Sequence, residues 1–391
     1  MRQRSIATGQ SLALLLAVAL CLLVPPALSA APDGVRMRDL TAEWQFDHRP
    51  VLGGFHNLYN ARIVEVPDKQ YPFRMWFFGW PVADNNPVGG RFIGDAIYHA
   101  RSADLQGWEV YAGEDARGGR QWDTTMNPEL WVPVVSGLDK GFENAIAGDP
   151  AVVKRGNWYY MAFSSVWFES HAEMTPQHMW VIGCIMGARS RDGIRWERTR
   201  EPILIWPKEH EIHQDAAGGV FKLDPGYCGS YHRPSLMFDE GRWKLWFDYM
   251  LPGTFVSLGY AENDGDFMDP KAWRVLNEGE HPQLRDWPNA SVVRVGNRYY
   301  NFCDAPGYPG EMGQDGRQIT MAESPDGKTW TVLGHIRPEG KASSHVPEAF
   351  VRREGHDTWL YVFYAWKPEL KPGEKWDYRY KETRYMRRKV G

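Results

Sequence analysis

Five polar or charged residues stand at the start of five similar apolar segments of this chain: Asn60, Asp149, Arg233, Asn289 and Glu348. Two of them are carboxylic acids, which can give or take a proton or attack as a nucleophile. Arg233 carries a planar guanidinium, which pairs in two-pronged fashion with a carboxylate or a sulfate. If the fold brings the five segments together, these residues form a site for acid–base chemistry or for binding an anionic group.

Each of the five residues heads a short apolar stretch, followed by a turn and an aromatic-rich stretch. The β-branched and aromatic residues alternate with polar ones, which is typical of β-hairpins. The five hairpins are predicted at residues 60–64 with 73–78, 149–163, 233–247, 289–302, and 348–351 with 359–364.

A second motif follows each of the first four hairpins: a strand ending in a small residue, a polar turn, and an aromatic residue. Its copies lie at residues 97–108, 183–196, 258–267 and 318–330. Self-similarity at long period indicates a radial or solenoid architecture, because one unit cannot bury its apolar face alone. The sequence therefore predicts an all-β fold, a five-bladed β-propeller of four-stranded antiparallel blades, with long insertions between strands.

Composition agrees with many short strands. The chain has 391 residues, of which 43% are hydrophobic, enough for a large core. Its 39 Gly and 27 Pro favour tight turns over long helices. A net charge of only −4 gives no support for nucleic acid or an anionic membrane as a partner.

The first thirty residues are predicted to be a signal peptide. Arg2 and Arg4 precede an apolar run at 12–24, and small residues at 29–31 suggest a cleavage region. Leu20 is too bulky to support a lipoprotein site at Cys21. Residues 35–391 are expected to form a single propeller domain, secreted or periplasmic. The basic segment 378–389 is expected to be a closing strand, with a solvated tail as the alternative.

The pattern resembles the five-bladed propeller glycosidases, the group that includes glycoside hydrolase families 43, 32, 68, 117 and 130. The most specific element is Gly-Asp-Pro-Ala-Val at 148–152, which is similar to the second-blade Asp-Pro motif of those enzymes. Families 43 and 32 place acids in the first, second and third blades. This chain matches the second with Asp149 and has Asn60 and Arg233 at the other two. The turns differ from sialidase Asp boxes by one residue.

The resemblance implies that the inner strands begin around one funnel and that a glycan binds there. Two groups must then flank the glycosidic bond. Asp149 and Glu348 are the candidate catalytic carboxyls, and their separation by one neighbouring blade suits an inverting pair. His232 is the alternative acid, as family 117 is thought to use a histidine. The predicted substrate-binding residues are Asn60, Arg62, Arg233, Asn289 and Asp304. Asp95 and Asp248 are weaker candidates.

Structural roles remain open for the same residues. Asp149 before a proline can simply cap a turn, and Glu348 can pair with Arg233 or Arg62. The histidines at 56, 232 and 345 lack metal-site spacing, so no metal or other cofactor is predicted, although the resemblance allows a Ca²⁺ ion in the pore. Loop tryptophans at 80, 131, 167 and 180 can stack on sugars or cover the core rim.

The sequence therefore predicts an exported glycoside hydrolase that acts on an oligo- or polysaccharide, with acidic or sulfated sugars suggested by Arg233. One alternative is a glycan-binding propeller without catalysis, suggested by Asn60 and Arg233 in place of acids. The other is a phosphorylase or a lyase-like enzyme, in which arginine and histidine bind phosphate or a uronate. The sugar, the linkage, the stereochemical outcome and the oligomeric state are left open.

Overall fold

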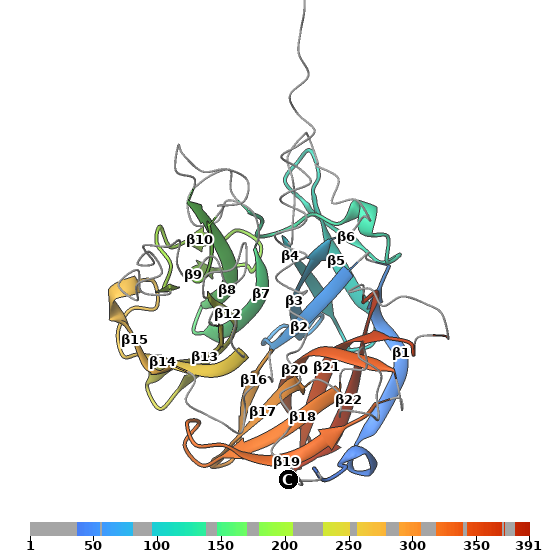
Figure 1. Cartoon of the computed structure of the whole chain (residues 1–391). Coiled ribbons are helices and arrows are strands. Elements are labelled where there is room, and N and C mark those ends of the chain that lie inside the picture. The colour runs from blue at the N-terminus through green and yellow to red at the C-terminus, as the bar shows by residue number, and fades with distance from the viewer. Residues whose placement is uncertain are drawn as a thin grey trace, which may run out of the picture.

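The protein is an all-β propeller in which sheets stand around a common axis (Figure 1). The computed structural model describes residues 37–54, 57–80, 96–137, 147–169, 180–205, 230–250, 256–278, 289–305, 318–338, 342–369, 371 and 380–391. Helical structure in these residues is confined to short 3₁₀ turns: η1 (Thr41–Glu43), η2 (Pro128–Leu130) and η6 (Pro270–Ala272).

The first two blades begin with inner strands β2 and β7, from which the other strands follow outward. Blade 1 consists of β2 (Asn57–Glu65), β3 (Phe73–Trp80), β4 (Ala96–Ser102), β5 (Trp108–Glu114) and β6 (Arg120–Asp123). Blade 2 consists of β7 (Gly148–Arg155), β8 (Trp158–Glu169) and β9 (Trp180–Ser190), with β10 (Glu197–Arg198) and β11 (Leu204–Ile205) both pairing with β9.

The other three blades have four strands each. Blade 3 consists of β12 (Ser230–Asp239), β13 (Arg242–Met250), β14 (Val256–Asn263) and β15 (Trp273–Glu278). Blade 4 consists of β16 (Ser291–Val295), β17 (Arg298–Ala305), β18 (Gln318–Ser324) and β19 (Thr331–Ile336). Blade 5 consists of β20 (Ser343–Glu354), β21 (Asp357–Lys367), β22 (Glu382–Lys389) and β1 (Gln45–Gly53).

The five inner strands close a ring. Contacts run from β2 to β7, β12, β16 and β20, and β20 returns to β2. One parallel pairing, Ser230 with Gly183, also joins blades 2 and 3 into a continuous sheet. The predicted five-bladed propeller is confirmed.

The N-terminal strand completes the last blade. β1 pairs antiparallel with β22, with Gln45 opposite Arg387 and Leu52 opposite Thr383. The basic segment near the C-terminus is therefore a strand, as expected, but its place is third from the axis. The outermost position belongs to β1, which comes from the other end of the chain.

The polar turns at 190–193 and 324–327, named here the Ser–Asp–Gly turns, join neighbouring blades to each other. In blade 2, the Ser190 hydroxyl accepts a hydrogen bond from the Gly193 N–H at 2.9 Å. The Gly193 carbonyl accepts one from Trp76 Nε1 of blade 1 at 3.0 Å. Blade 4 repeats the arrangement, since the Gly327 carbonyl accepts from Trp246 Nε1 of blade 3 at 2.7 Å. These two turns therefore hold adjacent blades together.

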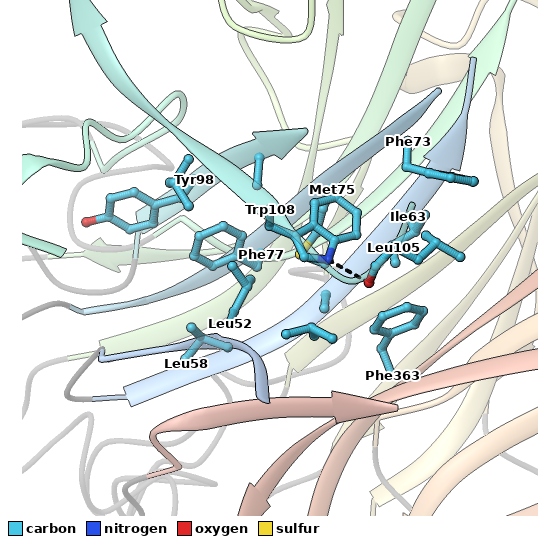
Figure 2. Close-up of a cluster of buried hydrophobic side chains, with 14 of the residues drawn as sticks. Leu52, Leu58, Ile63, Phe73, Met75, Phe77, Tyr98, Leu105, Trp108 and Phe363 are labelled. Atoms are coloured by element: carbon cyan, nitrogen blue, oxygen red, sulfur yellow. Dashed lines mark hydrogen bonds between the residues drawn. The ribbon is translucent and has the colours of Figure 1, made fainter. Parts of the chain in front are cut away.

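Apolar side chains fill the space between blades. Figure 2 shows the cluster between blades 1 and 5, where Leu52 and Phe363 of blade 5 pack with Met75 and Phe77 of blade 1. Trp108 joins the cluster and donates its indole N–H to the Leu105 carbonyl at 3.0 Å. Burying each large apolar side chain contributes about 1.5–3 kcal/mol, so these interfaces hold the inner strands in register around the axis.

Candidate active site

The inner strands share one irregularity near their start. In blades 1, 2, 3 and 5 the inner strand advances three residues while its partner advances two, which is a β-bulge. In each blade one residue at this point has a left-handed backbone, which is uncommon for residues other than glycine. These residues form the first ring: Asn60 (φ 55°), Asp149 (φ 48°), Arg233 (φ 50°), Asn289 (φ 63°) and Val346 (φ 48°).

A proline or an alanine follows every residue of the first ring. Proline fits there because the bulge interrupts the ladder of hydrogen bonds, so its missing N–H leaves no acceptor unsatisfied. The next residue resumes the pairing in four blades and begins the inner strand in blade 4. These residues form the second ring: Arg62, Ala151, Ser235, Ser291 and Glu348.

The structure corrects the expected register of the fifth blade. Glu348 was expected at the position equivalent to Asp149, but the left-handed residue of that blade is Val346. Glu348 lies two residues further along β20, in the second ring. The two acids therefore lie at different levels along the propeller axis rather than at the same one.

Glu348 is buried, with 4% of its surface exposed, and is held by two donors. Arg62 Nη1 lies 3.3 Å from its Oε2, and the Ser291 hydroxyl donates to the same oxygen at 3.0 Å. The pKa of Glu348 is raised to about 7: burial and, more weakly, the charge of Asp149 raise it, against the lowering effects of Arg62 and Ser291. Glu348 thus retains a proton close to neutral pH.

Asp149 is the second buried carboxyl at the axis. Burial raises its pKa, while the charge of Arg233 and a hydrogen bond from Ser164 act in the opposite direction. The Ser164 hydroxyl also accepts a hydrogen bond from the Arg233 N–H at 2.7 Å, which ties blade 2 to blade 3. The charge of Asp149 also acts on Glu348, although more weakly than burial, Arg62 and Ser291 do.

Arg233 forms an ion pair with Asp248, a residue that sequence analysis ranked low. Its Nη1 lies 2.9 Å from Asp248 Oδ2, and the Asn289 N–H donates to both oxygens of Asp248 at 3.1 Å. The Arg233 side chain keeps 22% of its surface exposed, against 1% for Asp248. Burial and the charge of Arg233 lower the pKa of the adjacent His232 to about 3, so this imidazole is neutral at neutral pH.

The side chain of Arg62 extends from blade 1 and forms hydrogen bonds with blades 2, 3 and 5. Besides Glu348, its guanidinium donates to the Val152 carbonyl of blade 2 and to the Leu236 carbonyl of blade 3, both at 3.2 Å. These contacts give Arg62 a role inside the protein, next to its predicted role in substrate binding. Beyond it lies a hollow of about 300 Å³, lined among others by Ile63, Val293 and Phe350. The lining residues follow the second ring along their strands, so the hollow lies on the side of Arg62 away from the first ring.

The other predicted residues have varied positions. Asn60 and Asn289 are both buried in the first ring. Trp131 donates its indole N–H to Asp123 at 2.7 Å and packs against Phe77, so it covers the core. His345 packs against Tyr59 and Tyr380. Outside the described residues lie His56, Asp95 and the side chains of Trp80, Trp167, Trp180 and Asp304.

Two serines of the candidate site, Ser164 and Ser291, were not predicted from the sequence. A usable signal existed for Ser291, because both Arg233 and Asn289 are followed two positions later by a serine, Ser235 in the first case. No comparable local signal marks Ser164, whose role depends on the neighbouring blade. Within the described part of the chain, no three His, Cys, Asp or Glu side chains are grouped closely enough to hold a metal ion.

Comparison with solved structures identifies the class of fold. A protein described as a glycoside hydrolase shares 15% identity, with 90% of this chain and 92% of that chain covered and a TM-score of 0.52. A family 117 glycoside hydrolase of the marine bacterium Zobellia galactanivorans shares 13% identity, with coverages of 88% and 89% and a TM-score of 0.50. An α-L-arabinofuranosidase from Lactobacillus brevis shares 11% identity, with coverages of 87% and 92% and a TM-score of 0.51.

The chain thus has the five-bladed propeller fold of glycoside hydrolases, as the sequence resemblance implied. No protein-family model matches it, and no curated protein matches it. Among the described residues, no helix has the length and hydrophobicity needed to cross a membrane.

Proposed function

We propose that this protein is a glycoside hydrolase whose active site lies at the first and second rings. The observation that carries the proposal is the presence of two buried carboxyls on the inner strands, Asp149 of blade 2 and Glu348 of blade 5. Hydrolysis of a glycosidic bond needs one carboxyl that holds a proton and one that is ionised. Two carboxyls in different environments can divide these roles between them.

In this proposal Glu348 is the general acid and Asp149 is the base or nucleophile. A pKa of about 7 keeps Glu348 protonated in a useful part of the population near neutral pH. Burial raises the pKa of Asp149, and the charge of Arg233 and the hydrogen bond from Ser164 oppose this rise. These two interactions are the ones that support an ionised Asp149 in the proposed mechanism. His232, neutral at neutral pH, is better suited to bind a sugar hydroxyl than to donate a proton.

The proposed substrate is an oligo- or polysaccharide outside the cytoplasm. The fold shared with glycoside hydrolases supports the carbohydrate class, and the signal-like first thirty residues support export. The partly exposed guanidinium of Arg233 supports a contact with an acidic or sulfated sugar. The inverting outcome stays a prediction.

The test is a glycan screen that records both products and binding for four proteins. Asp149→Asn and Glu348→Gln keep the side-chain shape and remove the proton-transfer role, so turnover should fall about 10²-fold or more. Glu354→Gln, which changes another carboxyl of β20, is the matched control and should retain turnover. The anomeric form of the first product, followed by NMR, tests the inverting outcome.

Two results would contradict the proposal. Full turnover by both Asp149→Asn and Glu348→Gln on a confirmed substrate would place the chemistry elsewhere. Specific glycan binding by the wild-type protein without any turnover would favour the non-catalytic alternative.

A further inference from the structure

The two hydrogen bonds to Glu348 end on the same oxygen. Arg62 Nη1 and the Ser291 hydroxyl both donate to Oε2, at 3.3 and 3.0 Å. The Ser291 oxygen in turn accepts from the Ala349 N–H at 2.9 Å. Among the described residues no donor is found for Oε1 of Glu348.

This asymmetry matters when Glu348 carries a proton. A neutral carboxyl has one carbonyl oxygen, which accepts hydrogen bonds, and one hydroxyl oxygen, which donates. Arginine has no acceptor atom and stays charged, so the oxygen that faces Arg62 must accept. Ser291 has a single hydrogen, and the Ala349 N–H already occupies an acceptor site on its oxygen. Oε2 is therefore favoured as the carbonyl oxygen.

We propose that Arg62 and Ser291 are positioning residues that fix the acidic proton of Glu348 on Oε1. The proposal deepens the proposed function and, in its catalytic part, rests on it: the hydrogen bonds from Arg62 and Ser291 to Oε2 would leave one defined proton, on Oε1, for the glycosidic oxygen. Without these two hydrogen bonds, the proton would distribute over both oxygens, and in part of the population it would point away from the substrate. A general acid is effective only when its proton lies within reach of the leaving group.

The chain supplies a matched control for Ser291. Ser235 has the same place in the second ring, one blade earlier, and both serines are fully buried. Ser235 Oγ accepts from the Val292 N–H at 2.9 Å, as Ser291 Oγ accepts from the Ala349 N–H at 2.9 Å. Both serines thus tie their blade to the next, and Ser291 differs in its bond to a carboxyl.

The charged groups that act on Glu348 are Arg62 from β2 and Asp149 from β7, and β16 contributes the Ser291 hydroxyl. Arg62 and Ser291 lower the pKa of Glu348, whereas Asp149 raises it. Removing the Ser291 hydroxyl should therefore raise the titration midpoint of Glu348, by about one pH unit for a hydrogen bond to a charged group. Removing the charge of Asp149 should lower the midpoint.

The experiment is pH-difference infrared spectroscopy on the full chain, which needs no substrate. The carbonyl band of protonated Glu348 is assigned by its loss in Glu348→Gln. Ser291→Ala should shift this band to higher frequency, because its carbonyl loses a donor, and should raise its midpoint. Ser235→Ala should change neither, and Asp149→Asn should lower the midpoint. Ser291→Cys, which keeps the volume with a weaker donor, replaces Ser291→Ala if that variant does not fold.

An unmoved band in Ser291→Ala, or equal shifts in Ser291→Ala and Ser235→Ala, would overturn the proposal. On a confirmed substrate, Ser291→Ala should also move the alkaline limb of the kcat/KM profile upward with little change in KM. If the predicted infrared shifts are observed but the protein turns over no glycan, the hydrolase proposal is wrong and the proposed proton position on Oε1 stands. If the protein turns over a glycan but the band does not move, the hydrolase proposal stands and the proposed proton position is wrong.

Discussion

Asp149 and Glu348 are both buried acids, but their neighbours differ. Glu348 has a guanidinium and a hydroxyl on one oxygen, whereas Asp149 has a hydroxyl and the charge of an arginine that is itself paired with Asp248. Burial outweighs these partners and raises the pKa of both groups. Ionising either one in the folded state is therefore costly, and this cost is measurable without a substrate.

Glu348 should make the protein less stable as pH rises. An ordinary ion-paired carboxyl, whose pKa is lowered on folding, has the opposite effect. The pKa of Glu348 is about 7 when folded and near 4.5 when unfolded. Between these values the folded state binds more protons, so Glu348 lowers the unfolding free energy as pH rises through this window. Glu348→Gln removes this contribution of Glu348 to the pH dependence of the unfolding free energy. The unfolding free energy of the variant relative to wild type should increase from pH 5 to pH 8, as measured by urea unfolding at each pH.

The control for this measurement is Ser235→Ala, which removes no titratable group and should differ from wild type by the same amount at each pH across the same range. A flat difference for Glu348→Gln as well would mean that Glu348 titrates near its ordinary value. The electrostatic basis of the proposed acid would then be lost.

Arg233 is the residue that tests substrate charge. Arg233→Lys keeps the positive charge beside Asp248 but loses the planar fork. It should weaken binding of an acidic or sulfated sugar about tenfold or more, while a neutral sugar should bind almost as before. Calorimetric titration with a matched pair of sugars measures both. Equal losses for the two sugars would mean that Arg233 only supports Asp149 and Asp248, and the preference for anionic sugars should then be dropped.

At the scale of the elements, the Ser–Asp–Gly turns join neighbouring blades, and the β-bulge near the start of the inner strands positions the residues of the candidate site. In blades 2 and 4 this turn has a left-handed glycine in close contact with a tryptophan of the preceding blade. At Gly193 (φ +79°) an added Cβ would lie 2.7 Å from Trp76 Cζ2. At Gly156 (φ +57°) no atom lies within 4 Å of such a Cβ. Alanine substitutions at these two glycines therefore separate the energetic cost of backbone strain from that of steric overlap.

Gly156→Ala should cost about 1 kcal/mol, because alanine is strained in the left-handed region. Gly193→Ala should cost that amount and about 1–3 kcal/mol more, because Trp76 is enclosed and cannot move aside freely. Chemical denaturation of both variants measures the difference. Equal costs would show that the interface between blades 1 and 2 adapts without penalty.

At the scale of the whole molecule, β1 closes the ring by joining the N-terminal segment to β22. Its Val51 and Leu52 are 4% and 1% exposed, and burying two such side chains contributes about 3–6 kcal/mol. A chain that starts at residue 54 should lose at least about 3 kcal/mol of unfolding free energy and expose the edge of β22 to association. A chain that starts at residue 37 keeps β1 and should match the full chain.

Denaturant unfolding and light scattering on the two truncated chains make this comparison. Adding a peptide of residues 37–54 in trans should restore part of the loss. Equal stability of the two chains would show that the propeller closes without β1.

Local patterns in the sequence were sufficient for the hairpins and for their number. The alternation of β-branched and aromatic residues predicted β2–β3, β7–β8, β12–β13, β16–β17 and β20–β21, because a strand shows its buried face in its own residues. The Ser–Asp–Gly turns were equally visible, since their hydrogen bonds join residues two or three positions apart.

The tertiary structure decided the register and the partners of the site. Polar character led to Glu348 as the fifth residue of the first ring, although the proline after Val346 marks the true position by analogy with Asp149 and Arg233. Strand β1 was missed because its partner lies at the other end of the chain. Arg62 and Ser291 meet Glu348 across 286 and 57 residues of sequence. Contacts of this kind exist only once five blades close into a ring, so the sequence alone indicates the candidate acids but not the groups that bind them.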